Sequence, residues 1–335
     1  MRLADVPFEL TRPVEPVPPP LRDLWGAATA RREAWRFHVH QPVQALGEAL
    51  LHGAMHRLPL DLASDIGARL SRGARRRMRG RPFVKRMARM LARLDSDRAG
   101  TPAAQAALLD RWFENTGRAY AEFAVLHRLP SDGRVVVEGM EHVQAAIAAR
   151  GQVALALCHL GAWETVGPVV PGLLGRPVVY TWQPQPNRFH NRVLWQRRRA
   201  EGTIALPPGA ASARLLRRLV VEGRESFGLF VDEVVDGASR FPPFWRPMPE
   251  RGNATVLLKL AHRVAAPVLP VWVLRTGRAR FTVHVDPPLA LDARAPLRAV
   301  LDEGRRQLAA RLEPVIRANP EQWYMLAEMR EPPRR

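Results

Sequence analysis

The sequence predicts an α/β fold, with a mostly parallel central sheet flanked by helices and an N-terminal helical region. Over residues 131–330, short apolar runs rich in β-branched residues alternate with helical segments, which is typical of βαβ units. Over residues 36–130, apolar residues recur at helical spacing. We therefore expect a proline-rich, extended lead-in over residues 1–35, an amphipathic basic helical region over 36–130, and an α/β core over 131–330.

The helical region is clearest in the stretch "FVKRMARMLARL", residues 83–94. Its apolar and basic side chains fall on opposite faces of a helix. Such a helix is typical of proteins that bind a membrane surface, but a helix that packs its apolar face on the core has the same pattern. A further helix is expected from Thr101 to His127, with these candidate core positions: Leu108, Leu109, Trp112, Phe113, Tyr120 and Phe123.

Six short apolar runs in the α/β core are expected to be strands. They cover residues 134–139, 152–158, 176–181, 226–232, 266–275 and 279–286. Helical segments lie between most of them, at residues 141–150, 187–201, 211–223 and 253–265, and a final helix is expected over 295–318. The last two runs are adjacent, which indicates a hairpin or a mixed edge of the sheet.

The charge balance is strongly basic, with 51 Lys and Arg against 32 Asp and Glu and a net charge of +19 in 335 residues. This predicts an anionic partner: nucleic acid, an anionic membrane surface, or an acidic carrier or substrate. The single cysteine excludes an intramolecular disulfide framework and a cysteine-based zinc site. No run of about eighteen apolar residues and no signal-peptide pattern occurs, so we expect neither a transmembrane helix nor a cleaved leader.

The stretch "ALALCHLGAWETVG", residues 154–167, carries the most reactive side chains. Because side chains alternate along a strand, Cys158 and His159 should point to opposite faces and share no proton directly. His159 then lies at the carboxyl end of a strand, where ligands of open α/β sheets bind. A turn at Gly161 could bring Glu164 back to the imidazole, where its carboxylate would hold one tautomer and stabilise the imidazolium.

Two further clusters could contribute to a site. In "FVDEVVDGASRFPPFWRP", Asp232, Glu233 and Asp236 follow an apolar run, and they could bind a metal, orient an arginine or a substrate hydroxyl, or form a solvated loop. The aromatic residues of this loop suit an apolar substrate or a membrane interface: Phe241, Phe244 and Trp245. The arginine-rich stretch 187–202 could bind phosphate or form a solvated basic face.

Taken together, these motifs resemble the lipid A late acyltransferases, the lauroyl and myristoyl transferases, within the H-x4-D/E lysophospholipid acyltransferase superfamily. "CHLGAWE" resembles the H-x4-D/E motif, and "GLFVDEVVDG" stands where the family has an acidic element. "NPEQWYMLAEMR" resembles the closing "P-E-Q-Y" segment, and the resemblance extends over residues 40–330. Phosphatidylinositol mannoside acyltransferases are related to the same family. The resemblance also implies a glycerolipid acyltransferase-like α/β fold.

The resemblance implies an O-acyltransferase that moves a fatty acyl chain from acyl-carrier protein or acyl-CoA to a hydroxyl of a lipid or glycolipid. His159 would be the general base, Glu164 its partner, Asp232 the acid of the third element, and Arg198 the arginine after the strand at Tyr180. The residues expected to bind substrate are Arg197, Glu233, Asp236, Trp163, Asn187 and Phe244. No metal or redox cofactor is expected.

Many enzymes of the lipid A family begin with a hydrophobic anchor helix, and no such helix is expected here. We therefore expect a peripheral protein on the cytoplasmic face of the inner membrane. The acceptor stays open between a lipid A precursor, a lysophospholipid and a phosphatidylinositol mannoside-type glycolipid. Two other classes of function compete: a non-catalytic lipid-binding protein, and a nucleic-acid-binding protein suggested by charge alone. No nucleic-acid-binding module is recognisable in the sequence, so we expect no nucleic-acid partner.

Overall fold

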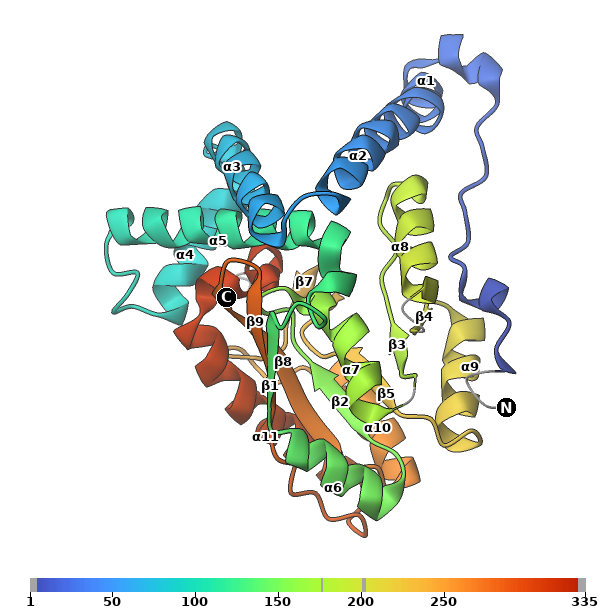
Figure 1. Cartoon of the computed structure of the whole chain (residues 1–335), viewed down its shortest axis with the longest axis vertical. Coiled ribbons are helices and arrows are strands. Elements are labelled where there is room, and N and C mark those ends of the chain that lie inside the picture. The colour runs from blue at the N-terminus through green and yellow to red at the C-terminus, as the bar shows by residue number, and fades with distance from the viewer. Residues whose placement is uncertain (1–4, 176, 201–202, 331–335) are drawn as a thin grey trace.

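The computed structural model describes residues 5–175, 177–200 and 203–330. Within them lies a seven-stranded sheet (Figure 1) with the strand order β1-β9-β8-β2-β5-β3-β4. In that order, its strands are Val135–Glu138, Arg280–Val285, Val268–Gly277, Ala154–Leu157, Phe227–Phe230, Val179–Thr181 and Ile204–Leu206. The α/β fold predicted from the sequence is confirmed.

The sheet is mostly parallel, as predicted. Strands β8, β2, β5, β3 and β4 run parallel to one another, and β9 pairs antiparallel with β8. This last pairing confirms the hairpin expected from the two adjacent apolar runs. Strand β4 was not predicted, because its three-residue run "IAL" is too short to stand out from the proline-rich sequence after it.

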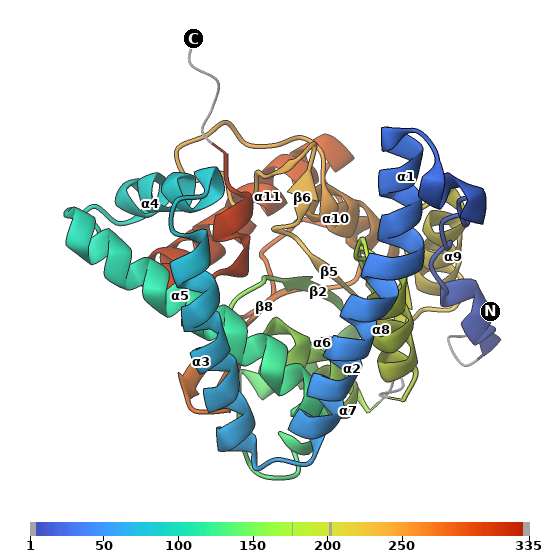
Figure 2. The ribbon, with the colours of Figure 1, turned by 90° about the horizontal axis from the view of Figure 1, so that it is seen from above.

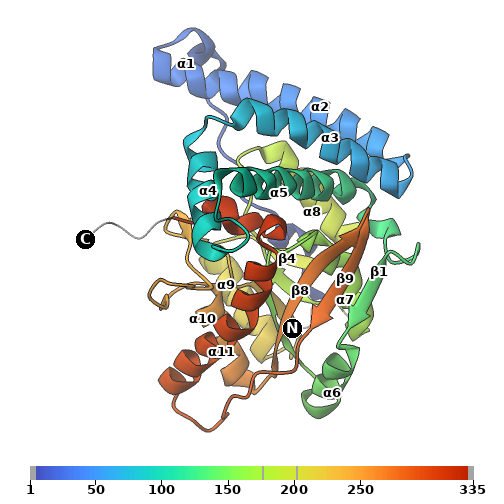
Figure 3. The ribbon, with the colours of Figure 1, turned by 90° about the vertical axis from the view of Figure 1, so that its left-hand side faces the viewer.

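Helices cover both faces of the sheet. The side chains of β2 point alternately into two buried clusters, one on each face. Leu155 and Leu157 belong to one buried cluster, which includes residues of α6 (Met140–Arg150) and α7 (Val166–Leu174). Ala154 and Ala156 belong to the other, with α9 (Ala210–Val221), α10 (Asn253–Val264) and α11 (Leu297–Ala318). Figure 3 shows these two groups of helices on opposite sides of the sheet. Both faces of β2 are therefore buried, which explains its uninterrupted apolar sequence.

The N-terminal helices lie across one end of the sheet. They are α1 (Ala28–Trp35), which continues through a π-helical turn (Arg36–His40) into α2 (Gln41–His56), then α3 (Leu60–Met78), α4 (Pro82–Leu94) and α5 (Pro102–Glu122). The expected lead-in over residues 1–35 thus includes one regular helix, α1. Seen from above in Figure 2, α3 and α5 stand on one side of the sheet edge, and α2 and α8 (Arg188–Ala200) on the other.

The basic amphipathic helix of the sequence is α4, and its apolar face packs on the core. Val84, Met87, Met90 and Leu91 are all buried in the cluster that also contains residues of α5, α10 and α11. This face is consequently not available to a membrane. None of the helices in the described part of the chain is both long enough and apolar enough to cross a bilayer.

Helices α3 and α5 cross at very short range. A Cβ atom added to Gly117 would lie 2.4 Å from Ser71 Cβ and 2.5 Å from the carbonyl oxygen of Gly67. We expect Gly117→Ala to lower the free energy of unfolding by about 2 kcal/mol, because the two helices must separate. Gly73→Ala, in an open position of α3, should raise it by about 1 kcal/mol through helix propensity.

Urea denaturation of the two variants measures this difference directly. Because both substitutions add one methyl group to a helical glycine, Gly73→Ala is the matched control for size and propensity. Equal stabilities of the two variants would contradict the assignment of Gly117 to a tight helix crossing.

Candidate active site

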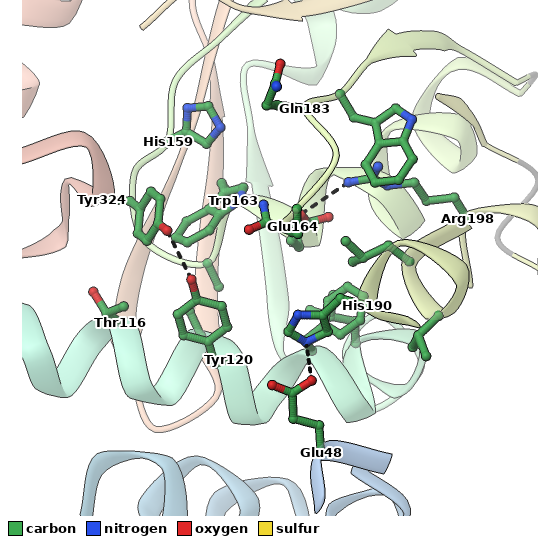
Figure 4. A pocket seen from close by; sticks show the side chains of 18 of the residues that line it. Glu48, Thr116, Tyr120, His159, Trp163, Glu164, Gln183, His190, Arg198 and Tyr324 are labelled. Carbon is green, nitrogen blue, oxygen red and sulfur yellow. Dashed lines mark hydrogen bonds and ion pairs between the residues drawn. The ribbon is translucent and has the colours of Figure 1, made fainter. Parts of the chain in front are cut away.

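A cavity of about 2020 Å³ opens at the carboxyl ends of β2 and β5. Its walls come from α3 and α5 on one side and from α2, α8, α9 and α10 on the other. Figure 4 shows His159, Trp163, Glu164 and Arg198 around this space, with Tyr324 beside the histidine. The position agrees with the general rule that open α/β sheets bind ligands beyond the carboxyl ends of their strands.

Strand register brings His159 and Asp232 together. Strands β2 and β5 are parallel neighbours, and Leu157 is paired with Phe230. His159 and Asp232 each follow this pair by two residues, so both lie at the same edge of the sheet. His159 Nδ1 is 2.8 Å from Asp232 Oδ1. The imidazole thus has a carboxylate partner that comes from the adjacent strand.

The Asp232 carboxylate is fully buried, and four donors from the described residues reach it. Oδ1 accepts the His159 ring N–H, while Oδ2 accepts the His159 backbone N–H at 2.9 Å, the Trp323 indole N–H at 2.8 Å and the Cys158 thiol at 3.2 Å. Burial raises the pKa of Asp232, but the His159 charge and the hydrogen bonds from His159 and Trp323 outweigh it. They hold the pKa below its ordinary value, so the carboxylate is ionised.

This pairing fixes the tautomer of His159. An ionised carboxylate can only accept hydrogen bonds, so Nδ1 carries the proton and donates it to Asp232. In the neutral ring the lone pair is then on Nε2. The ring stacks on Phe230 with centroids 4.0 Å apart and lines the cavity. The histidine is therefore held in the orientation and tautomer of a general base.

Cys158 contacts the same carboxylate from the other side. It packs in the buried cluster with Ala154 and Ala156, whereas His159 lines the cavity. Burial, followed by the charge of Asp232, raises the pKa of the thiol well above its ordinary value. The thiol therefore stays protonated and serves as a donor to Asp232 rather than as a nucleophile.

The turn after His159 requires glycine at position 161. Its φ is +57°, and an added Cβ would lie 2.6 Å from the carbonyl oxygen of Val273. The turn leads into a short 3-10 helix, Trp163–Thr165, whose side chains Trp163 and Glu164 line the cavity. The turn predicted from the sequence is thus present, and it directs Glu164 into the cavity.

Glu164 pairs with Arg198 rather than with His159. Its Oε1 is 3.4 Å from Arg198 Nη2, and the guanidinium lies 4.8 Å from the centre of the Trp182 ring. The pairing of His159 with Glu164 expected from the sequence is therefore corrected. The physical reason is that the end of a parallel neighbour strand lies closer to the imidazole than a side chain five residues along the same loop.

Comparison with known proteins gives one family. The family model described as bacterial lipid A biosynthesis acyltransferase matches residues 35–329. The chain belongs to this family. It is an acyltransferase of the EC 2.3.1 type, and the family indicates acceptors of the lipid type. No protein with a curated description matches the chain.

The acidic element of this acyltransferase divides into three separate roles. Asp232 pairs with the histidine. Glu233 also lines the cavity, and its Oε1 accepts the backbone N–H of Asn253 at 2.6 Å, at the start of α10. Asp236 lies at a φ of +51° next to Gly237 in the turn between β6 (Val234–Val235) and β7 (Ala238–Ser239). Among the described residues, no group of three or more His, Cys, Asp or Glu side chains could hold a metal ion.

Other predicted substrate-binding residues of the acyltransferase have structural contacts. Asn187 accepts the backbone N–H of Phe189 at 3.1 Å and thereby caps the start of α8. Phe244 packs edge-on against Trp323 with centroids 5.6 Å apart, away from the cavity lining. The side chain of Arg197 lies outside the described residues.

Two tyrosines at the cavity were not recognised as site residues in the sequence. The hydroxyl groups of Tyr120 and Tyr324 are 3.0 Å apart, and both side chains line the cavity. Figure 4 shows Tyr324 beside His159 and Tyr120 next to Tyr324. Tyr120 was expected in the core, but 60% of it is exposed. The "NPEQWY" segment, which resembles a family motif, could have pointed to Tyr324. The helical pattern of α5 does not distinguish Tyr120 from its buried neighbours.

Proposed function

We propose that this acyltransferase moves a fatty acyl chain from the thioester of acyl-CoA or acyl-carrier protein to a hydroxyl of a lipid or glycolipid. The observation that carries the proposal is the His159–Asp232 pair facing a cavity large enough for two substrates. A thioester is already activated, so the enzyme must chiefly deprotonate the hydroxyl and stabilise the charges that develop.

In the proposed reaction, His159 Nε2 accepts the proton of the acceptor hydroxyl while the oxygen attacks the thioester carbonyl. The new carbon–oxygen bond gives a tetrahedral intermediate, whose collapse breaks the carbon–sulfur bond. The imidazolium then returns its proton to the departing thiolate, which leaves as a free thiol. Asp232 stabilises the imidazolium throughout, because it is ionised and hydrogen-bonded to Nδ1.

The polarity of the cavity walls supports a division between the two substrates. All the described lining residues contributed by α3, α4 and α5 are uncharged: Gly67, Leu70, Ser71, Ala74, Met78, Phe83, Trp112, Phe113, Thr116, Gly117, Ala119, Tyr120 and Ala121. The opposite wall contributes polar and charged groups, among them Glu164, Gln183, His190 and Arg198. We assign the acyl chain to the uncharged side and the polar part of the acceptor to the side of Arg198.

The exposed apolar face of α2 supports action at a membrane surface. Val43, Leu46 and Leu50 stand one and two turns apart on this helix and are 66%, 62% and 67% exposed. Leu46 also lines the cavity. A bilayer that receives these side chains would lie next to the cavity, so that a lipid acceptor could enter without crossing water.

The transfer reaction is tested with the purified protein, acyl-CoA or acyl-carrier protein as donor, and a total inner-membrane lipid extract as acceptor. Mass spectrometry of the products identifies the acylated lipid and separates lipid A precursors from lysophospholipids and mannosides. We expect an acylated lipid that depends on protein and donor. Binding of lipid with no transfer from either donor would overturn the proposal in favour of a non-catalytic lipid-binding protein.

We expect the double substitution Val43→Glu and Leu50→Glu to weaken binding to vesicles of phosphatidylethanolamine and phosphatidylglycerol by at least about tenfold. Burial of each apolar side chain contributes about 1.5–3 kcal/mol, and two carboxylates would have to be dehydrated in its place. Vesicle flotation measures the change. Val136→Glu, at an exposed position of the edge strand β1, is the control and should bind vesicles as the parent does. An equal loss of vesicle binding in the control and in the α2 variant would refute the role of α2 in membrane binding.

A further inference from the structure

The segment that follows α11 contacts both the Asp232 carboxylate and the loop of His159. It consists of a 3-10 turn (Pro320–Gln322), Trp323, and a second 3-10 turn (Tyr324–Glu328). Trp323 is fully buried. Its indole N–H donates to Asp232 Oδ2 at 2.8 Å, and its carbonyl oxygen accepts the indole N–H of Trp112 at 2.8 Å.

The same segment holds the backbone of the histidine loop. The N–H of Tyr324 donates to the carbonyl oxygen of His159 at 2.9 Å, and the N–H of Gly161 donates to the carbonyl oxygen of Gln322 at 3.0 Å. The side chain of Gln322 bonds in turn to the backbone N–H of Arg275 on β8, at 2.8 Å. One short segment therefore fixes both the histidine loop and Asp232 Oδ2, the carboxylate oxygen that does not bind the imidazole ring.

We propose that Trp323 is a positioning residue for acyl transfer: its indole N–H, assisted by the thiol of Cys158, fixes the Asp232 carboxylate so that Oδ1 is presented to His159. The inference rests on the proposed function for its kinetic consequences, but the geometry of the pair can be measured without turnover. It also gives the buried thiol a role as a donor.

The physical basis is the cost of an unpaired charge. Asp232 has no exposed surface, so a hydrogen bond removed from Oδ2 is not replaced by bulk water. Loss of the indole donor leaves the carboxylate less stabilised and freer to rotate about its Cβ–Cγ bond. Its pKa then rises, because a hydrogen bond to the charged form is lost.

Other groups that titrate near Asp232 are few among the described residues. Cys158 and His159 face it from the loop after β2, and Glu233 follows it in the chain. Tyr324 contributes its backbone to the His159 loop, and its ring lies 6.4 Å from the imidazole. Burial raises the pKa of Glu233 to about 8, so Glu233 titrates on the alkaline side. A shift of the acid limb of the pH–rate profile therefore reflects a change in the His159–Asp232 pair.

The test compares Trp323→Phe with Trp112→Phe. Both remove one buried indole N–H and keep an aromatic ring, but only the first removes a donor to Asp232. For Trp323→Phe we expect the acid limb of kcat/KM to move up by about one pH unit and kcat to fall about tenfold, with KM unchanged. Trp112→Phe should leave the acid limb in place. Coincident profiles of parent and Trp323→Phe, or equal shifts in both variants, would overturn the proposal.

A second comparison keeps the test decisive if Trp323→Phe does not fold. Cys158→Ser retains a donor to Oδ2, whereas Cys158→Ala removes it. We expect the acid limb to move up slightly in the alanine variant and to stay in place in the serine variant. The opposite order would count against the role of the donors around Oδ2.

Proton NMR separates this inference from the proposed function. The His159 Nδ1 proton, bonded to a carboxylate, should give a low-field resonance that is absent from His159→Ala. We expect it to shift in Trp323→Phe and to keep its position in Trp112→Phe, whether or not the protein transfers acyl groups. An unchanged resonance in Trp323→Phe would refute the positioning role even in a fully active enzyme.

Discussion

His159→Ala is expected to lower kcat for acyl transfer by about 10³-fold, because it removes the group that accepts the hydroxyl proton. The surrounding structure should change little, since the imidazole lines the cavity and its ring neighbours, Phe230 and Trp163, belong to a separate strand and a separate 3-10 helix. The measurement is the initial rate of acylated lipid formation at saturating donor and acceptor.

His190→Ala is the matched control for this substitution. His190 also lines the cavity, but it bonds to Glu48 Oε2 at 3.1 Å and lies apart from His159, as Figure 4 shows. We expect it to keep kcat within a few-fold of the parent. Retention of transfer by His159→Ala, in a protein with a native thermal transition, would remove His159 from the role of general base.

Asp232→Asn is expected to lower kcat by about 10³- to 10⁴-fold with little change in KM. Asparagine keeps the shape of the side chain but replaces one oxygen by an NH₂ group and removes the charge that stabilises the imidazolium. If the amide nitrogen faces His159, it donates to Nδ1 and leaves the proton on Nε2, where the base must be free. Steady-state rates over a range of acceptor concentrations give kcat and KM separately.

Glu164→Gln distinguishes the two candidate partners of the histidine. It removes the charge that pairs with Arg198 at 3.4 Å and leaves the His159–Asp232 hydrogen bond intact. We expect it to raise KM for the acceptor several-fold and to change kcat less than Asp232→Asn does. A larger loss of kcat in Glu164→Gln than in Asp232→Asn would support Glu164, as the motif spacing suggested, as the carboxylate partner of His159.

The sequence predicted most of the sheet from short apolar runs, and those of the central strands β2, β5 and β8 are largely buried on both faces. It failed at β4, where three residues give too little pattern. It also predicted that His159 and Asp232 lie at the carboxyl ends of strands, since each follows such a run, and the structure places both there. Their pairing could not be derived, because it depends on β2 and β5 being neighbours, and no local pattern encodes the strand order.

The same limit explains the residues that were missed. Trp323 bonds to Asp232, which lies 91 positions earlier in the chain, and Tyr324 bonds to the still more distant His159. Contacts over such separations leave no spacing signal in the sequence. Asn187 was read as a substrate ligand, but a helix cap uses the same side chain in the same position. Local patterns thus predicted which residues lie at the strand ends, whereas packing decided which of them are hydrogen-bonded to each other.

The contacts of the segment 320–328 also set an order of events during synthesis. A chain on the ribosome acquires His159 and Asp232 well before Trp323, and domains fold from the N-terminal side as they emerge. Until the last helix and the segment after it have packed, the carboxylate lacks one of its donors and the histidine loop lacks its backbone partners. A nascent chain can therefore carry a nearly complete sheet while the segment that holds Asp232 and the histidine loop is still unpacked.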